Sequence, residues 1–486
     1  MHTDRFTPLD AATLLRWMQH DLPNKQLFGI DRELFFMPKP DDPFRMERYG
    51  KVLETPLGVA AGPHTQLAQN ILSAWLCGAR YIELKTVQVL DELNVAKPCI
   101  DMADEGYNCE WSQELKLDQS FEEYLKAFVL LYVLRDMLNL PVEAEPGKGP
   151  GFIFNMSAGY NLEGIKSPAL QRFLDRMENA EEDVKRIKAG LAPLYPAIEK
   201  MPIPARLSDN LTVSTMHGCP PDEVESIGRY FITERKYNTA IKLNPTLLGP
   251  ERLRDILNTQ LGYDVCVPDE AFGHDLKYND GVAIIRNLAA AAETAGVAFG
   301  LKLTNTLETA NEKQNLPRSE GMVYMSGRSL HPISINLAER LQQEFDGKLD
   351  IAFSAGVDTF NVADTLACGL RPITMSSDIL KPGGYGRLHQ YLDTLRAEMR
   401  KAGAHTIAEW EKSRSPIADN PGFANLVSYA AAVLGKRSRY HKERFPYVSV
   451  KTERPLPRFD CAAAPCMSGC PAEQDIPRYL DAVARG

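Results

Sequence analysis

The sequence of 486 residues contains no run of eighteen or more apolar residues, which argues against a membrane-spanning helix. Its first five residues lead into no signal-peptide core, so we expect a cytoplasmic protein. Acidic and basic residues are interspersed, and the formal net charge of −9 comes without a basic stripe or a polybasic patch. This charge pattern argues against nucleic acid and membranes as partners.

Two common signatures of binding sites are also missing. No Gly-x-Gly-x-x-Gly motif follows the first predicted strand, which argues against a doubly wound, dinucleotide-binding sheet. The nine cysteines do not form the two Cys-x2-Cys pairs that are typical of structural zinc sites. Six cysteines are scattered singly, as is usual for reduced and mostly inert thiols: Cys77, Cys99, Cys109, Cys219, Cys266 and Cys368.

What the sequence does contain is a regular alternation of strand-like and helix-like segments between about residues 50 and 400. Eight such repeats predict a (β/α)8 TIM barrel, an α/β fold, in preference to a doubly wound sheet. The predicted strands are 56–61, 80–84, 151–156, 211–215, 239–243, 298–303, 349–353 and 371–375. The predicted helices are 67–76, 121–138, 168–177, 223–234, 251–257, 336–344, 361–368 and 387–399.

Three cysteines crowd together near the end of the sequence, namely Cys461, Cys466 and Cys470. Their spacing, Cys-x4-Cys-x3-Cys-Pro, is typical of iron–sulfur ligands, and it resembles the cluster segment of glutamate synthase small subunits and dihydropyrimidine dehydrogenase. A 4Fe–4S cluster needs a fourth ligand. Either the chain is a piece of a longer electron-transfer enzyme, or a side chain such as Glu473 completes the cluster.

The alternation of strands and helices stops after about residue 400. A helical pattern at 422–434 leads into a basic, aromatic segment, and Pro455 and Pro457 then form a stiff linker. We therefore expect four parts: an N-terminal extension (1–50), the barrel (51–400), a helical extension with a linker (401–457) and a short, partial iron–sulfur segment of ferredoxin type (458–486).

The loop after the fourth predicted strand carries His217 and Cys219. Loops at the C-terminal ends of barrel strands hold the reactive groups of such proteins, so this cysteine is a candidate acid, base or nucleophile. A buried structural cysteine beside the turn-forming Pro220 and Pro221 is the alternative.

Two lysines, Lys85 and Lys242, stand at the ends of predicted strands. Burial in a barrel mouth would remove much of their hydration, which is unfavourable unless an anionic or electron-rich partner receives them. A reduced flavin is one such partner, because its N1–O2 edge becomes negative. A barrel without flavin, in which one of the lysines forms a Schiff base, is the alternative.

Small residues and hydroxyls follow the first and the late strands. Backbone N–H groups and hydroxyls after strands seven and eight bind phosphate in many barrels, although each such residue alone is more often a turn residue. Together with the lysines they outline a phosphorylated redox cofactor, and FMN fits best. The candidate cofactor-binding residues are Ala61, Gly62, Lys85, Thr86, Lys242, Asn244, Thr304, Gly327, Ala355, Gly356, Ser376 and Ser377.

From about residue 50 to 400 the chain resembles the FMN barrels of dihydropyrimidine dehydrogenase and the dihydroorotate dehydrogenases. Residues 57–87 match the first β-α-β unit of that group, and residues 240–243, Ala-Ile-Lys-Leu, match its second flavin lysine. Within the group, and over nearly its whole length, the chain is most similar to the bacterial YgfK-type proteins, which are described as iron–sulfur subunits of a selenate reductase. The resemblance implies that Lys85 and Lys242 contact FMN.

The same resemblance implies a substrate site. Residues 107–110, Tyr-Asn-Cys-Glu, are similar to the Asn-x-Glu motif that contacts the polar edge of a pyrimidine, and residues 304–306, Thr-Asn-Thr, match a second pyrimidine-contacting motif. The implied substrate-binding residues are Asn108, Glu110, Asn305 and Thr306. These side chains offer both donors and acceptors, which suits a heterocycle with alternating N–H and C=O groups.

The loop around Cys219 takes the place of the active-site loop in which the group has its general acid or base. That loop usually reads Asn-x-Ser-Cys-Pro, whereas residues 215–220 read Thr-Met-His-Gly-Cys-Pro. The expected asparagine is absent and His217 stands in the loop, so the sequence does not determine the substrate.

These observations predict an FMN-dependent oxidoreductase acting on a C=C or C=N bond of a pyrimidine-like or purine-derived heterocycle. Cys219 is the candidate general acid or base, with His217 as the second candidate. Electrons would pass through iron–sulfur centres from an FAD/NAD(P)H module on another segment or subunit. The alternative is a non-catalytic flavin and iron–sulfur subunit of a larger selenate reductase or molybdenum enzyme. Whether the chain forms a homo-oligomer stays open.

Overall fold

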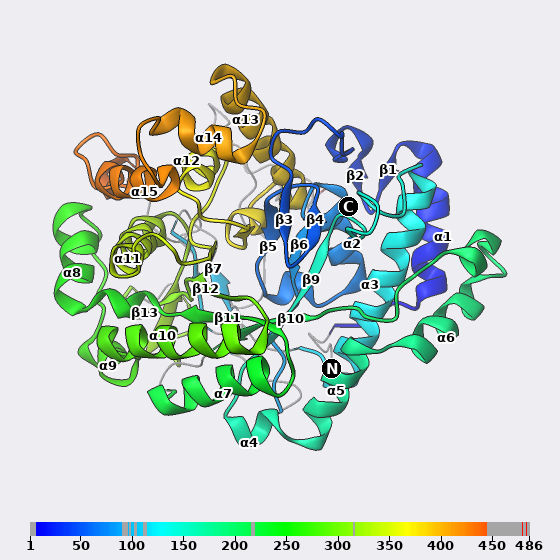
Figure 1. Ribbon diagram of the computed structural model, residues 1–486, viewed down its shortest axis with the longest axis horizontal. Helices are drawn as coiled ribbons and strands as arrows, with labels where there is room; N and C mark the ends of the chain where they lie inside the picture. The colour runs from blue at the N-terminus through cyan, green and yellow to red at the C-terminus, as the bar shows by residue number, and fades with distance from the viewer. Residues whose placement is uncertain are drawn as a thin grey trace.

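The computed structural model describes residues 6–89, 96, 99–101, 105–109, 114–214, 219–313, 316–444, 479 and 483. Eight parallel strands form a closed barrel in chain order, and the last strand pairs with the first. Helices surround this barrel (Figure 1). The predicted (β/α)8 TIM barrel is therefore confirmed.

Each of the eight predicted strands overlaps one barrel strand. Nearly all residues of these strands are buried, because the barrel interior covers one face and the helices cover the other. The strands are β5 (Leu57–Val59), β6 (Tyr81–Glu83), β9 (Ile153–Ala158), β10 (Asn210–Ser214), β11 (Asn238–Leu243), β12 (Phe299–Leu303), β15 (Ile351–Phe353) and β16 (Ile373–Met375).

Of the helices around the barrel, α5 begins at an ordinary capping signal. Ser167 accepts a hydrogen bond from the backbone N–H of Leu170 at the start of α5, and Pro168 occupies its first position. The helices are α2 (Ala68–Leu76), α3 (Leu117–Met137), α4 (Leu162–Ile165), α5 (Pro168–Glu178), α6 (Glu181–Leu191), α7 (Pro221–Thr233), α8 (Pro250–Arg254), α9 (Asp269–His274), α10 (Tyr278–Ala295), α11 (Leu330–Glu344), α12 (Val362–Ala367) and α13 (Arg387–Lys401).

The long helix between β11 and β12 was missed by the sequence prediction, which placed only residues 251–257 there. That segment is helical, as α8 followed by a π-helical turn (Asp255–Gln260), but α10 is the helix that packs against α7. The sequence did contain signals for α10. Four consecutive alanines favour a helix, and Gly296, which adopts a left-handed conformation (φ 70°), marks its C-terminal end. Its N-terminus has no side-chain cap to mark it.

An N-terminal hairpin covers the end of the barrel where the strands begin. It consists of β3 (Met46–Arg48) and β4 (Lys51–Leu53), after the short pair β1 (Gln26–Leu27) and β2 (Ile30–Asp31) and the first helix α1 (Ala11–Asp21). Arg48 pairs with Asp350 (3.0 Å), just before β15, and Lys51 pairs with Asp209 (2.8 Å), just before β10. The hairpin does not cover the opposite end of the barrel, where the strands end and ligands can bind.

A four-stranded antiparallel sheet lies at that opposite end, and the sequence prediction did not include it. Its strand order is β13 (Leu307–Ala310), β14 (Met322–Met325), β8 (Tyr107–Asn108) and β7 (Ile100–Asp101). These strands have two to four residues each, too few to show an alternating pattern in the sequence.

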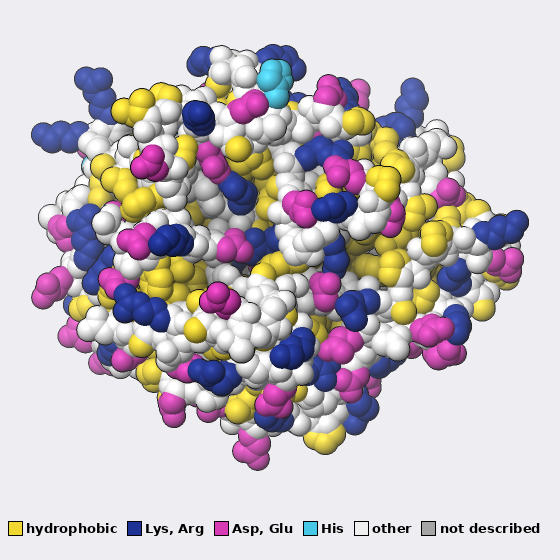
Figure 2. Space-filling model, in the orientation of Figure 1, with side chains coloured by type: hydrophobic (Ala, Val, Ile, Leu, Met, Phe, Trp, Pro, Cys, Tyr) yellow, Lys and Arg dark blue, Asp and Glu magenta, His cyan; other side chains and the backbone are white. Residues whose placement is uncertain are grey.

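The described chain continues with α14 (Ile407–Arg414) and α15 (Pro421–Ala432), the latter close to the helix expected at 422–434. Among the described residues, no helix is both long and apolar enough to cross a membrane. On the face shown in Figure 2, Lys and Arg are interspersed with Asp and Glu, as expected from the sequence.

A buried ion-pair network fixes the chain segment before the first barrel strand. Glu54 accepts hydrogen bonds from Arg80 (2.6 Å) and Arg135 (3.0 Å), and all three side chains are at most 2% exposed. The Arg80 guanidinium also lies over the Trp75 ring at 4.4 Å. Removal of the carboxylate would leave two buried guanidinium groups without their counter-ion.

We therefore expect Glu54→Gln to lower the free energy of unfolding by about 3–5 kcal/mol, the usual effect of breaking a buried ion pair. Urea denaturation followed by circular dichroism measures this. The matched control is Glu47→Gln, whose exposed pair with Lys148 (2.9 Å) is worth about 1 kcal/mol or less. Equal stability of the two variants would contradict the assignment.

Candidate functional site

A pocket of about 520 Å³ lies at the C-terminal ends of the barrel strands. All eight strands contribute to it, through their last residues or the loops that follow, and the antiparallel sheet adds Asn108 and Tyr324. The other lining residues are Ala60, Ala61, Lys85, Thr86, Gln88, Gly159, Ser214, Lys242, Thr304, Asn305, Thr306, Ser326, Gly327, Arg328, Leu330, Ser354, Ala355, Gly356, Val357, Asp358, Thr374, Met375, Ser376, Ser377, Asp378 and Lys381.

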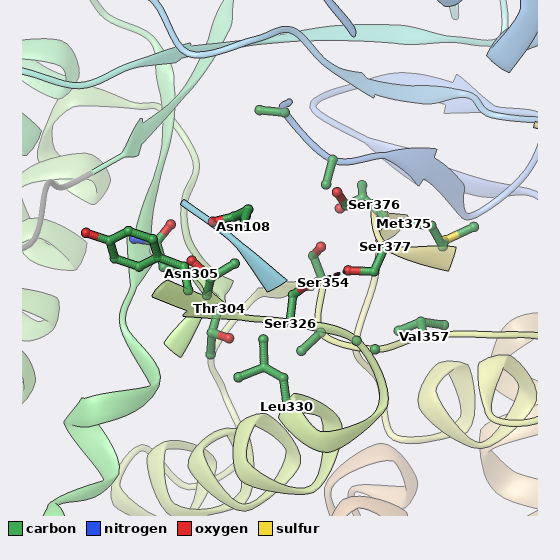
Figure 3. A pocket seen from close by; sticks show the side chains of 18 of the residues that line it. Asn108, Thr304, Asn305, Ser326, Leu330, Ser354, Val357, Met375, Ser376 and Ser377 are labelled. Carbon is green, nitrogen blue, oxygen red and sulfur yellow. Dashed lines mark hydrogen bonds between the residues drawn. The ribbon is translucent and has the colours of Figure 1, made fainter. Parts of the chain in front are cut away.

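One side of the pocket is a cradle of small and hydroxyl residues (Figure 3). A Cβ atom on Gly356 would lie 2.1 Å from the carbonyl oxygen of Gly327, and both glycines have positive φ. The hydroxyls of Ser326 and Ser377 are hydrogen-bonded at 2.7 Å. Glycine is thus required where the loops after β14 and β15 meet, and the serines join them to the loop after β16.

This cradle also receives the N-terminal end of a helix. Gly327, Arg328 and Leu330 line the pocket where a 3-10 turn (Gly327–Ser329) leads into α11. The Arg328 side chain is only 3% exposed. A helix N-terminus with a buried guanidinium favours an anionic group such as a phosphate.

Beneath the pocket, the barrel interior holds a buried ion pair. Lys302 of β12 donates hydrogen bonds to Glu83 of β6 and to the hydroxyl of Thr374 of β16. Lys302 is 1% exposed and Glu83 is 4% exposed. The second oxygen of Glu83 accepts a hydrogen bond from the backbone N–H of Ala61 (3.2 Å), so the pair also fixes a pocket-lining loop.

The Lys242 side chain reaches the same region from β11. Burial lowers its pKa to about 8, while the negative charge of Glu83 opposes this shift and the positive charge of Lys302 adds to it. At neutral pH this lysine is therefore mostly protonated but close to its titration point, and its charge depends on the Glu83–Lys302 pair.

Asn108 is the most unusual polar group of the site. It is fully buried, it lines the pocket, and both its amide nitrogen and its amide oxygen lack a hydrogen-bond partner among the described residues. Figure 3 shows it beside Asn305, on the side of the pocket away from Ser376 and Ser377. An unpaired buried amide is unfavourable unless a ligand supplies one acceptor and one donor.

Neighbouring side chains hold the amide of Asn305 and the hydroxyl of Thr304 in place. Asn305 donates to the side-chain oxygen of Asn244 (2.7 Å), and Thr304 shares a hydrogen bond with Ser334 of α11 (2.9 Å). Asn244 itself is not among the lining residues that the structure describes. Its hydrogen bond with Asn305 orients the side-chain amide of Asn305.

Cys219 lies two residues before the start of α7, and it is half-buried and outside the described lining of the pocket. Burial, with smaller effects of Glu223 and Asp222, raises the pKa of its thiol to about 11. The thiol is therefore protonated at neutral pH, which suits a proton donor rather than a base. The sequence left Cys219 as a candidate for either acid or base, because burial of the thiol cannot be derived from the sequence.

Several predicted site residues lie outside the described residues, so these assignments stay predictions. They are Glu110, His217, Cys461, Cys466 and Cys470. Within the described part of the chain, no group of three or more His, Cys, Asp or Glu side chains is placed to hold a metal ion. Gly62, like Asn244, is described but lies outside the described lining.

The sequence analysis missed the charged groups that surround the predicted residues, namely Glu83, Lys302, Arg328, Asp358, Asp378 and Lys381. A signal for two of them was present. Glu83 and Lys302 are charged residues inside two of the predicted strands, 80–84 and 298–303, where a buried charge requires a partner. No sequence pattern links the other four to the site.

Residues 28–420 match the family described as oxidoreductase YgfK, N-terminal TIM-barrel domain. The chain belongs to the YgfK family. Over 477 residues it is 42% identical to YgfK of Escherichia coli strain K12 and equally to YgfK of E. coli O157:H7. The match covers 94% of this chain and 44% of each relative, so this YgfK-family chain spans less than half the length of these curated relatives.

Among solved structures, the fold of this YgfK-family chain is similar to that of ligand-free DHODH from Eimeria tenella. The TM-score is 0.50 at 16% sequence identity, over 82% of this chain and 97% of the other. Identity this low shows a common fold and no more.

The titration of Lys242 can be measured by competitive labelling with an amine-specific reagent, followed by peptide mass spectrometry. We expect labelling to rise as pH increases through about 8, because the neutral amine forms above that pH. Lys302→Met should raise this midpoint, since Lys242 then loses a positive neighbour and keeps the carboxylate of Glu83. Exposed Lys401 provides an internal reference; an unshifted midpoint would contradict the coupling.

Proposed function

We propose that this chain is the FMN-binding, catalytic part of an oxidoreductase that reduces or oxidises a C=C or C=N bond of a neutral nitrogen heterocycle. The observation that carries the proposal is the buried, unpaired amide of Asn108 in the same pocket as Lys85, Lys242 and the glycine-serine cradle. One pocket thus combines a phosphate-binding end, a cationic centre and a neutral polar end.

The pocket residues fit FMN by their chemistry. The cradle with Gly327, Gly356, Ser376 and Ser377 offers backbone N–H groups and hydroxyls of the kind that hold a phosphate. Lys85 and Lys242 would hold the edge of the isoalloxazine that becomes negative on reduction. FMN, when bound, supplies hydride chemistry that amino-acid side chains cannot provide.

The neutral end of the pocket supports a heterocyclic substrate. Asn108, Asn305, Thr306 and Tyr324 contribute amides and hydroxyls, and none of these groups carries a charge. Such a set can pair with the alternating N–H and C=O groups of a pyrimidine or a related ring. An anionic substrate such as an oxyanion would instead favour arginine at this end.

Cys219 is the proposed proton donor. The raised pKa of its thiol keeps the proton in place at neutral pH until a substrate atom accepts it. Because the thiol lies outside the described lining of the pocket, the proposal requires Cys219 to approach the substrate when the substrate binds.

We also propose the route by which electrons reach the flavin. The Cys461, Cys466 and Cys470 segment would hold a 4Fe–4S cluster that relays electrons from an FAD/NAD(P)H module. The greater length of the YgfK relatives is consistent with such a module on the same polypeptide. If the chain serves only as an electron-transfer subunit, its flavin would be reduced through a partner and never oxidised by a heterocycle.

The first test is an absorption spectrum of protein purified without oxygen, followed by denaturation and identification of any released flavin. We expect a flavin spectrum and release of FMN, with additional broad absorbance if a cluster is bound. A colourless protein that takes up no added FMN would reject the proposal and leave the Schiff-base alternative for Lys85 and Lys242.

Replacement of the proposed proton donor provides a second test. Cys219→Ala should leave flavin content unchanged and lower turnover of a heterocycle by roughly 10²–10⁴-fold, the usual contribution of a general acid. The matched control is Cys266→Ala, which removes an exposed thiol. Undiminished turnover in the Cys219 variant would exclude the assignment.

A further inference from the structure

The segment after α15, residues 435–444, returns to the pocket loops, and we refer to it as the strap. Its Tyr440 is 3% exposed and stacks on His331 of α11, with ring centroids 5.2 Å apart and planes 17° apart. Tyr440 thereby brings a segment from the end of the described chain against the helix whose N-terminus opens onto the pocket.

Hydrogen bonds continue from this stack into the loop after β15. Nδ1 of His331 donates to the carbonyl oxygen of Ala355 (2.7 Å), which leaves Nε2 to accept from the Tyr429 hydroxyl (3.0 Å). Burial lowers the pKa of His331 to about 4, so the ring is neutral and carries one N–H. The Tyr440 hydroxyl joins this chain by contacts with Tyr429 (3.2 Å) and Asn361 (2.9 Å).

The strap also neutralises a charge in the pocket. Nη1 of Arg439 lies 2.7 Å from both carboxylate oxygens of Asp358, a pocket-lining residue, and the Arg439 guanidinium lies over exposed Phe360 at 4.6 Å. The backbone carbonyl of Arg439 accepts a hydrogen bond from Arg328, which lines the pocket too. Arg439 therefore neutralises the acidic side chain of Asp358 and helps to hold the basic side chain of Arg328.

The need for this compensation follows from the charges around the cradle. Two carboxylates line this side of the pocket, Asp358 and Asp378, and either alone would repel a phosphate. Arg387 binds both oxygens of Asp378 (2.8 and 2.9 Å), as Arg439 does for Asp358. Lys381 also lies 3.8 Å from Asp378, so each acid on this side has a basic partner, and the buried guanidinium of Arg328 adds a further cation, which suits a phosphate dianion.

We propose that Arg439 of the strap is a positioning residue for the phosphate of the cofactor: it neutralises Asp358 and supports Arg328, and so makes an otherwise acidic loop accept an anion. The inference rests on the proposed function, since it concerns the phosphate end of the proposed FMN site. It assigns a role to a segment beyond the barrel itself.

The test compares the affinities of the 486-residue apoprotein for FMN and for riboflavin, which lacks the phosphate, by fluorescence titration. Arg439→Met should weaken FMN binding by about ten-fold or more relative to riboflavin, the effect of about 1.4 kcal/mol of uncompensated charge repulsion. The double variant Asp358→Asn with Arg439→Met should restore the preference for FMN, because it removes both charges. The control is Arg437→Met, since Arg437 is an exposed residue of the same strap.

The other outcomes separate this inference from the proposed function. Equal weakening for both flavins, or a double variant no better than the single one, would mean that Arg439 only supports the fold and would overturn the inference. A wild-type protein that binds both flavins equally tightly would overturn it as well and leave the flavin site standing. A wild-type protein that binds neither would instead reject the proposed function.

Discussion

The constraint on which the site depends is the burial of charge inside the barrel. Glu83 and Lys302 lie below the pocket at almost no exposure, and each is tolerated there only because the other is present. Their pairing fixes the loop after β5 through Ala61 and sets the electrostatic environment of Lys242. A barrel interior of apolar side chains would be as stable. Lys242 would then lack the neighbouring charges that influence its pKa.

The same principle operates at the rim of the pocket. Asp358 and Asp378 are each held by an arginine from the C-terminal part of the chain, Arg439 and Arg387. The loops that approach a ligand are therefore supported by segments that do not line the pocket themselves. Pairing within the protein leaves a cationic cradle at one end and an unpaired amide, Asn108, at the other.

Much of this fold could be predicted from the sequence, because barrel strands are buried on both faces and stand out as short apolar runs. All eight predicted strands overlap barrel strands, and the lysines at two of their ends line the pocket. The prediction missed α10, which has no N-terminal side-chain cap, and the short strands of the antiparallel sheet, which have no readable period. It also missed the raised pKa of Cys219, because burial is a property of the packed chain.

The sequence by itself determined the order of the strands and which polar residues stand at their C-terminal ends, since both follow from local patterns of apolar and polar residues. Only the tertiary structure decided which charges meet. Glu83 and Lys302 are 219 residues apart, and Asp358 and Arg439 are 81 residues apart. Such pairs arise when the barrel closes and the strap folds back, because hydrogen bonds and ion pairs depend on distances in space that no local pattern specifies.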